Sequence, residues 1–131
     1  MYEWHGWATI RTRFHAEDDL EADPDDDTVR AVRALLAAVP GHPNEVLDLR
    51  CANGDVQLWL AGLHNHAGNG VVELFHAIAA AAPGSYGLLH VYDDEDRDAP
   101  NTWSCHVMRR GTVTRHADRF LSPHVGLVED P

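Results

Sequence analysis

Apolar positions along the chain follow a period of two in some stretches and a helical period in others. A period of two is typical of strands that are buried on one face, and a period near 3.6 is typical of amphipathic helices. The pattern predicts strands at 4–14, 46–51, 56–60, 87–92, 102–108 and 112–116, and helices at 28–39 and 71–82. Asp26 or Asp27 can cap the first helix, because aspartate accepts the free N–H groups of a first turn.

The clearest local signal is a predicted hairpin between residues 46 and 60. Two alternating stretches flank Asn53-Gly54, the preferred pair for a tight type I′ turn. The alternation predicts an inward face made of Leu47, Leu49, Cys51, Val56, Leu58 and Leu60. Trp59 then lies on the opposite face, where a loop could cover it or a partner could bind it.

These elements predict an α+β fold in the order β-α-β-β-α-β-β-β. A single antiparallel or mixed sheet would carry both helices on one face. The other face would carry Trp7, Thr9 and Trp59. We find no internal repeat and no shift in composition, so we expect one domain over residues 1–131. The tail from Phe120 to Pro131 is predicted to lie over the core as irregular chain.

Charge limits the partners of this chain. The net charge is −11, from 21 acidic and 10 basic side chains. Such a field disfavours direct binding of nucleic acid or of an anionic membrane, and favours a basic partner or simply solubility. No apolar run reaches the roughly 20 residues that span a bilayer, and the opening Met1-Tyr2-Glu3-Trp4 lacks the features of a signal peptide. We therefore expect a cytoplasmic protein, with Cys51 and Cys105 as buried thiols rather than a disulfide.

Two segments concentrate the acidic residues. Residues 93–98 contain five carboxylates in six positions, and residues 17–27 contain eight in eleven. Neither segment fits a calcium-binding EF-hand loop, because the required glycine and glutamate positions hold other residues. Each is either a solvated loop or a place where a positively charged partner binds.

Residues for catalysis are scattered. No serine lies in a Gly-x-Ser-x-Gly elbow, and the adjacent Cys105 and His106 point to opposite faces of a strand. His64, His66 and Asp93 are the only group that we can name for a metal-assisted hydrolase, which is the alternative function. The histidines follow no zinc-finger spacing, so we expect no metal site and no cofactor.

Three segments together carry a resemblance to a known family. They read Glu3-Trp4-His5-Gly6-Trp7-Ala8-Thr9-Ile10-Arg11, Gly87-Leu88-Leu89-His90-Val91-Tyr92-Asp93-Asp94-Glu95 and Asp118-Arg119-Phe120-Leu121-Ser122-Pro123. In this order they resemble the seventh family of immunity proteins from bacterial polymorphic toxin systems. The resemblance implies a small cytoplasmic protein, encoded beside a toxin that is often a nuclease, which binds and blocks that toxin's C-terminal domain. It implies no catalytic residues.

The resemblance and the charge together give a hypothesis for the binding surface. An acidic inhibitor can occupy the basic surface of a nuclease and associate with it fast. The partner-binding candidates are Asp93, Asp94, Glu95 and Asp96, with Glu17, Asp18 and Asp19, and Trp59 as an aromatic anchor. Trp103 is expected to be a core residue instead. The open sheet face could also serve self-association.

Overall fold

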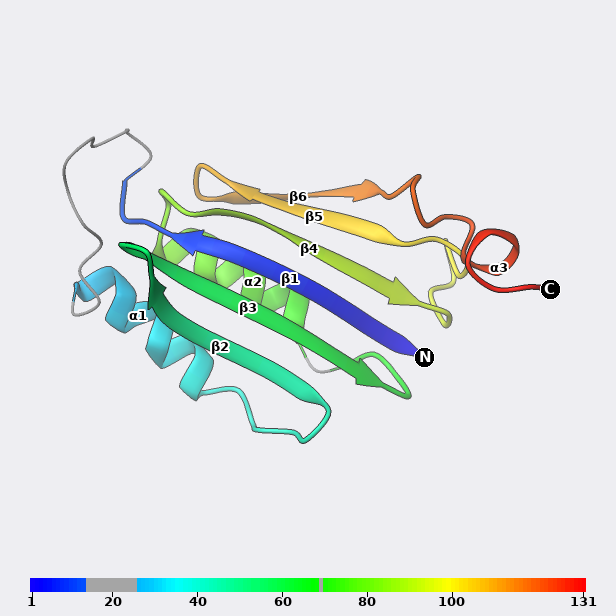
Figure 1. The fold of residues 1–131 in the computed structure, drawn as a ribbon, viewed down its shortest axis with the longest axis horizontal. Helices are drawn as coiled ribbons and strands as arrows, with labels where there is room; N and C mark the ends of the chain where they lie inside the picture. Colours follow the sequence, from blue (N-terminus) through cyan, green and yellow to red (C-terminus); the bar gives the residue numbers. More distant parts are fainter. Residues whose placement is uncertain (14–25, 69) are drawn as a thin grey trace.

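A computed structural model describes residues 1–13, 26–68 and 70–131. The described residues form one six-stranded antiparallel sheet with two main helices on the same face (Figure 1). The elements are β1 (Tyr2–Ile10), α1 (Asp27–Ala37), β2 (Glu45–Ala52), β3 (Asp55–His64), α2 (Val71–Ala81), β4 (Tyr86–Asp93), β5 (Ser104–Arg109), β6 (Thr112–Ala117) and the short α3 (His124–Leu127). The predicted α+β class and the predicted order are confirmed.

The strand order is β2-β3-β1-β4-β5-β6, which places β1 in the middle of the sheet. β1 pairs antiparallel with β3 on one side and with β4 on the other (Figure 1). Because side chains alternate between faces, Trp4, Ala8 and Ile10 of β1 point into the core under the helices. The core is therefore organised around the first strand of the chain.

The largest buried side chain of β1, Trp4, lies over Gly62 of β3. The two residues are direct partners in the register of β1 and β3. A Cβ added at Gly62 would overlap the Trp4 ring. The indole is 1% exposed and occupies the space that a side chain at position 62 would fill. Glycine is required here for space rather than for an unusual backbone angle.

Two strand boundaries differ from the prediction. β1 ends at Ile10 rather than Phe14, because the Arg11 N–H donates to Ser85 Oγ (2.9 Å) instead of to a neighbouring strand. Phe14 lies outside the described residues. β3 continues to His64, beyond the predicted end at Leu60, because His64 and Leu63 still pair with the first residues of β1.

Both tight turns in the sheet follow the sequence signals. Asn53 and Gly54 have φ values of 51° and 84°, and Arg110 and Gly111 have φ values of 49° and 76°. Positive φ at both central residues is the property of a type I′ turn, whose twist matches that of the flanking strands. The predicted hairpin is confirmed, and Arg110-Gly111 makes an equivalent turn between β5 and β6.

The buried-thiol prediction for Cys51 is wrong. Cys51 is exposed and Cys105 is partly buried, and both thiols are free, as expected. Cys51 lies near the end of β2, an edge strand, where it has a strand neighbour on only one side. Alternation correctly placed Cys51 on the same face as its buried partner Val56, but β2 has no neighbouring strand on its outer side.

Asp26 is the N-cap of α1. Its Oδ1 accepts the N–H of Thr28 (2.7 Å), and this hydrogen bond lowers the pKa of the carboxyl. Replacing Asp26 by alanine is expected to lower the free energy of unfolding by about 1 kcal/mol, the usual cost of losing a cap. Urea denaturation at pH 7 measures the change. The matched control is Asp27→Ala, whose side chain is 99% exposed and which should change stability by only a few tenths of this amount. Equal losses in the two variants would contradict the capping role.

Candidate functional site

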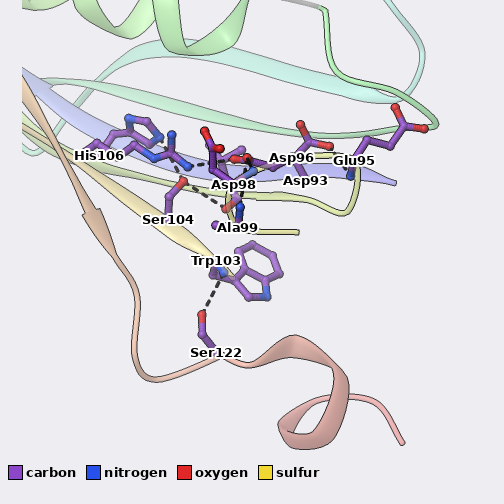
Figure 2. A network of polar contacts seen from close by, with 11 residues as sticks. Asp93, Glu95, Asp96, Asp98, Ala99, Trp103, Ser104, His106 and Ser122 are labelled. Carbon is purple, nitrogen blue, oxygen red and sulfur yellow. Dashed lines mark hydrogen bonds and ion pairs between the residues drawn. The ribbon is translucent and has the colours of Figure 1, made fainter. Parts of the chain in front are cut away.

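The acidic residues after β4 form a compact turn that their own side chains shape (Figure 2). Asp93 Oδ1 accepts the N–H of Glu95 (3.0 Å), and Asp96 Oδ1 accepts the N–H groups of Asp98 (2.9 Å) and Ala99 (3.2 Å). Aspartate is common in turns because it accepts hydrogen bonds from the backbone two or three residues ahead. The carboxylates of Asp93 and Asp96 therefore hold the turn.

Asp96 also joins the turn to β6. Its Oδ2 lies 3.1 Å from Arg115 Nη2. The backbone N–H of Asp98 and the Arg115 guanidinium hold the pKa of the Asp96 carboxyl below its usual range. Such a shift indicates that the ionised form is stabilised in place. Asp96, which is only partly exposed, is better suited to supporting the turn than to contacting a partner.

The other acidic residues of the turn face outward. Asp94 pairs with the N-terminal ammonium of Met1, and Glu95 Oε1 lies 2.7 Å from His66 Nδ1, an exposed partner. In Figure 2, Glu95 extends away from the rest of the cluster. Asp94, Glu95 and Asp98 are exposed. Of the four predicted residues in this segment, Asp94 and Glu95 are thus the ones available to a partner.

The C-terminal segment packs beside this turn, on the face of the sheet that the helices leave open. Tyr92 stacks on Trp103 and on His124, with ring centroids 5.3 and 4.1 Å apart. Trp103 Nε1 donates to His124 Nδ1 (3.0 Å). Trp103 is 6% exposed, so its predicted core role is confirmed. The irregular tail covers the end of the open face rather than the helix-side core.

Negative charge from the turn and from the tail meets around Tyr92. Burial raises the pKa of the Tyr92 hydroxyl, and the charges of Asp94, Glu129 and Asp93 raise it further. Glu129 belongs to the tail and Asp94 to the turn, so the two segments contribute to one negatively charged end of the molecule. The exposed carboxylates of this acidic end are Asp94, Glu95, Asp98, Glu129 and Asp130.

Trp59 lies elsewhere on the open sheet face. It is 39% exposed, sits opposite Trp7 in the register of β3 and β1, and has the Arg50 guanidinium 6.0 Å from its ring centroid. Trp7 is five residues along β1 from Tyr2, the strand partner of Asp93. At about 3.4 Å per residue this is roughly 17 Å. The predicted facing of Trp59 is confirmed, but the structure does not bring it next to the acidic residues.

The comparison with protein families identifies the family of this chain. The family model described as Immunity protein 7 matches residues 1–130. The chain belongs to this family. The resemblance seen in the three sequence segments is thereby confirmed. No curated protein and no solved structure matches the chain significantly.

Membership in the Immunity protein 7 family makes this chain an immunity protein of a toxin–immunity system. Immunity proteins of this kind are generally inhibitors of toxins rather than enzymes, and they bind their cognate toxin. Among the residues that the structure describes, no helix is long and apolar enough to cross a membrane. Because immunity proteins bind their cognate toxin, the relevant site is a protein-binding surface.

The residues named for a metal-assisted hydrolase have separate partners in the immunity protein. His64 Nε2 lies 2.9 Å from Glu45 Oε1, whereas His66 pairs with Glu95 and Asp93 accepts a backbone N–H in its own turn. Within residues 1–13, 26–68 and 70–131, no three His, Cys, Asp or Glu side chains are grouped to hold a metal ion. A cavity of about 10 Å³ beside Trp4 and Leu74 has room for about one water molecule, not for a substrate.

Glu17, Asp18 and Asp19 lie outside the described residues, so their predicted role in binding stays a prediction. The tail was predicted to lie over the core, but it exposes a set of large apolar residues that the prediction did not treat as a surface: Phe120, Leu121, Val125, Leu127 and Val128. Proline and glycine interrupt this stretch, so it has neither a helical nor a strand period. The signal that could have found it is the density of apolar residues directly before Glu129 and Asp130.

Proposed function

We propose that this immunity protein acts in the cytoplasm, as one domain, and neutralises a basic toxin domain through its acidic end. The supporting observation is the exposed group Asp94, Glu95 and Asp98 on a turn whose backbone is fixed by Asp93 and Asp96. A fixed array of negative charge attracts a basic surface from a distance and loses little conformational entropy when it binds. A nuclease fits this description, because its active site must attract phosphates.

The test of this function uses the toxin encoded beside the immunity gene. Its C-terminal domain, made catalytically inactive, should form a complex with the immunity protein, and the active domain should lose toxicity when both proteins are expressed together. Failure to bind and failure to protect would refute the proposed function. Binding that depends strongly on salt would support the electrostatic part of the proposal.

Reversing two charges of the acidic end should slow association. We expect Glu95→Lys with Asp98→Lys to lower the association rate constant for the inactive toxin domain by about tenfold at low salt, because steering depends on local charge. The control is Asp27→Lys with Asp55→Lys, which changes the net charge equally at sites on α1 and on the β2–β3 hairpin. Stopped-flow or biosensor kinetics measure both rates. Equal slowing in the two double variants would show that only the overall charge matters, and would exclude the acidic end as the contact.

A further inference from the structure

The tail of the immunity protein exposes an unusual number of large apolar side chains. Within nine residues, Phe120 is 75% exposed, Leu121 45%, Val125 40%, Leu127 58% and Val128 50%. Single exposed apolar residues are ordinary on protein surfaces. Five in one short segment are not, because exposed apolar groups that lie together usually mark an interaction site. We refer to these five residues as the apolar tail segment.

The backbone of the apolar tail segment is anchored to the molecule. Asn101 accepts the N–H groups of His124 (3.0 Å, at its carbonyl) and of Val125 (2.7 Å, at its side-chain oxygen). Ser122 Oγ accepts the N–H of Trp103 (2.9 Å), as Figure 2 shows, and His124 is buried against Tyr92. A frayed tail would lose entropy on binding, whereas this one already has a defined conformation.

Carboxylates border the apolar tail segment. Glu129 and Asp130 follow it in the chain and are exposed. Asn101, which holds Val125, lies just beyond the acidic turn, so the turn and the tail are neighbours in space as well. Figure 1 shows α3 beside the connection between β4 and β5, at the same end of the sheet. The apolar tail segment and the acidic end thus lie at the same end of the sheet, with Arg119 beside Phe120 at the start of the segment and carboxylates after Val128.

We infer that the apolar tail segment is the apolar centre of the toxin-binding surface, and that its partner is a face of the cognate toxin domain with an apolar hollow bordered by lysine and arginine. This inference rests on the proposed function and adds the residues that supply the binding energy. Protein interfaces commonly have a fully desolvated apolar core inside a polar rim, and the core carries most of the affinity. The carboxylates then set the association rate, and the apolar residues set the dissociation rate.

Charge identifies the toxin domain, rather than other partners, as the occupant. In a symmetric pair of two copies the same patch meets itself, so the carboxylates of one copy would face those of the other. Like charges across an interface oppose association. An anionic membrane or a nucleic acid would be repelled in the same way. A protein surface with an apolar hollow and a basic border is complementary both to the apolar residues and to the carboxylates beside them.

The experiment compares two matched double variants with the inactive C-terminal toxin domain as the probe. Leu127→Ser with Val128→Ser removes side chains that are 58% and 50% exposed in the apolar tail segment. Val46→Ser with Leu63→Ser removes side chains that are 55% and 50% exposed on the open sheet face. Calorimetry gives the Kd of each, and circular dichroism verifies that both variants are folded. We expect the tail variant to raise Kd at least tenfold, mainly through faster dissociation, and the control to change Kd less than twofold.

Several results would overturn the inference. A tail variant that binds within twofold of the unaltered protein refutes it while the proposed function stands. A larger loss in the control variant assigns the contact to the open sheet face instead. Sedimentation of the immunity protein alone tests self-association. A dimer that the tail variant abolishes would identify a second copy of the chain as the partner of this segment. If the unaltered protein does not bind the toxin domain, the proposed function fails, and the inference fails with it.

Discussion

Replacing Gly62 by alanine is expected to lower the free energy of unfolding by about 3 kcal/mol, the upper range for adding a group to a packed core. The added methyl group would overlap the Trp4 ring, which is buried between β1 and the helices. The backbone at neither residue can move easily, because β1 and β3 each have a neighbouring strand on both sides. Guanidinium denaturation followed by tryptophan fluorescence measures the loss. A change below about 1 kcal/mol would mean that the indole has room to move.

Two further variants separate the overlap from a general effect of replacing glycine. Gly41→Ala adds a methyl group where no atom lies within 4 Å, and it should leave the stability nearly unchanged. Trp4→Leu removes the ring that Gly62 accommodates, at the cost of a core substitution. The double variant with Gly62→Ala should then lose less than the sum of the two single losses, because the smaller side chain removes the clash. Strict additivity would contradict the proposed contact.

Lowering the pH from 7 to 4 is expected to remove about 2 kcal/mol of stability through His106 alone. Burial of the His106 ring lowers its pKa from 6.5 to about 4, and the positive charge of Arg115 adds to the effect. His106 lies opposite Arg115 in the register of β5 and β6, and its Nε2 lies 3.2 Å from Ser104 Oγ. In the unfolded chain His106 therefore binds a proton near pH 6.5, whereas in the folded protein it does so only near pH 4. The contribution of His106 to the free energy of unfolding is fully present above pH 6.5 and is lost as the pH drops towards 4.

The size of this effect follows from the shift in pKa. At 1.36 kcal/mol per unit the full shift corresponds to about 3 kcal/mol, which solvent screening at the exposed Arg115 reduces to about 2 kcal/mol. His106→Leu places an apolar side chain at this buried position and removes the titration. Urea denaturation between pH 4 and pH 7 should give a flatter curve for this variant than for the unaltered protein. Parallel curves would show that His106 does not titrate in this range.

Local signals in the sequence predicted the elements of this fold well. Asn53-Gly54 and Arg110-Gly111 adopt the left-handed backbone that their turns require, and Asp26 caps α1. These features depend on residues within a few positions of each other. The side of the sheet on which Trp59 lies also followed from simple alternation, because the register of a strand fixes the facing of all its residues.

The features that the sequence did not predict depend on residues far away in the chain. β3 extends through Gly62 because β1 provides partners for it, and β1 stops at Ile10 because Ser85 binds the next N–H group. Cys51 is exposed because its strand lies at an edge, and the strand order is not readable from the alternation of one strand. In each case tertiary contacts decided what local propensity left open.

The acidic turn also combines a feature that the local sequence predicts with features that depend on distant residues. Its composition was visible in the sequence, and it made the segment after β4 a candidate for partner binding. Composition could not distinguish Asp96, which holds the turn through the N–H of Asp98 and through Arg115, from Glu95, which extends outward (Figure 2). The distinction requires the position of β6 beside the turn. The apolar tail segment escaped prediction because its partner, Asn101, lies more than twenty residues earlier.

The central position of β1 also determines when a newly made chain can fold. β1 is made before both of its neighbours, β3 and β4, so it remains without its second neighbour until Asp93 has been synthesised. Pairings between distant segments make folding slow, in the range of milliseconds to seconds for sheet-rich domains. The delay before a cell is protected from the toxin therefore includes the completion of the sheet and not only the translation of the gene.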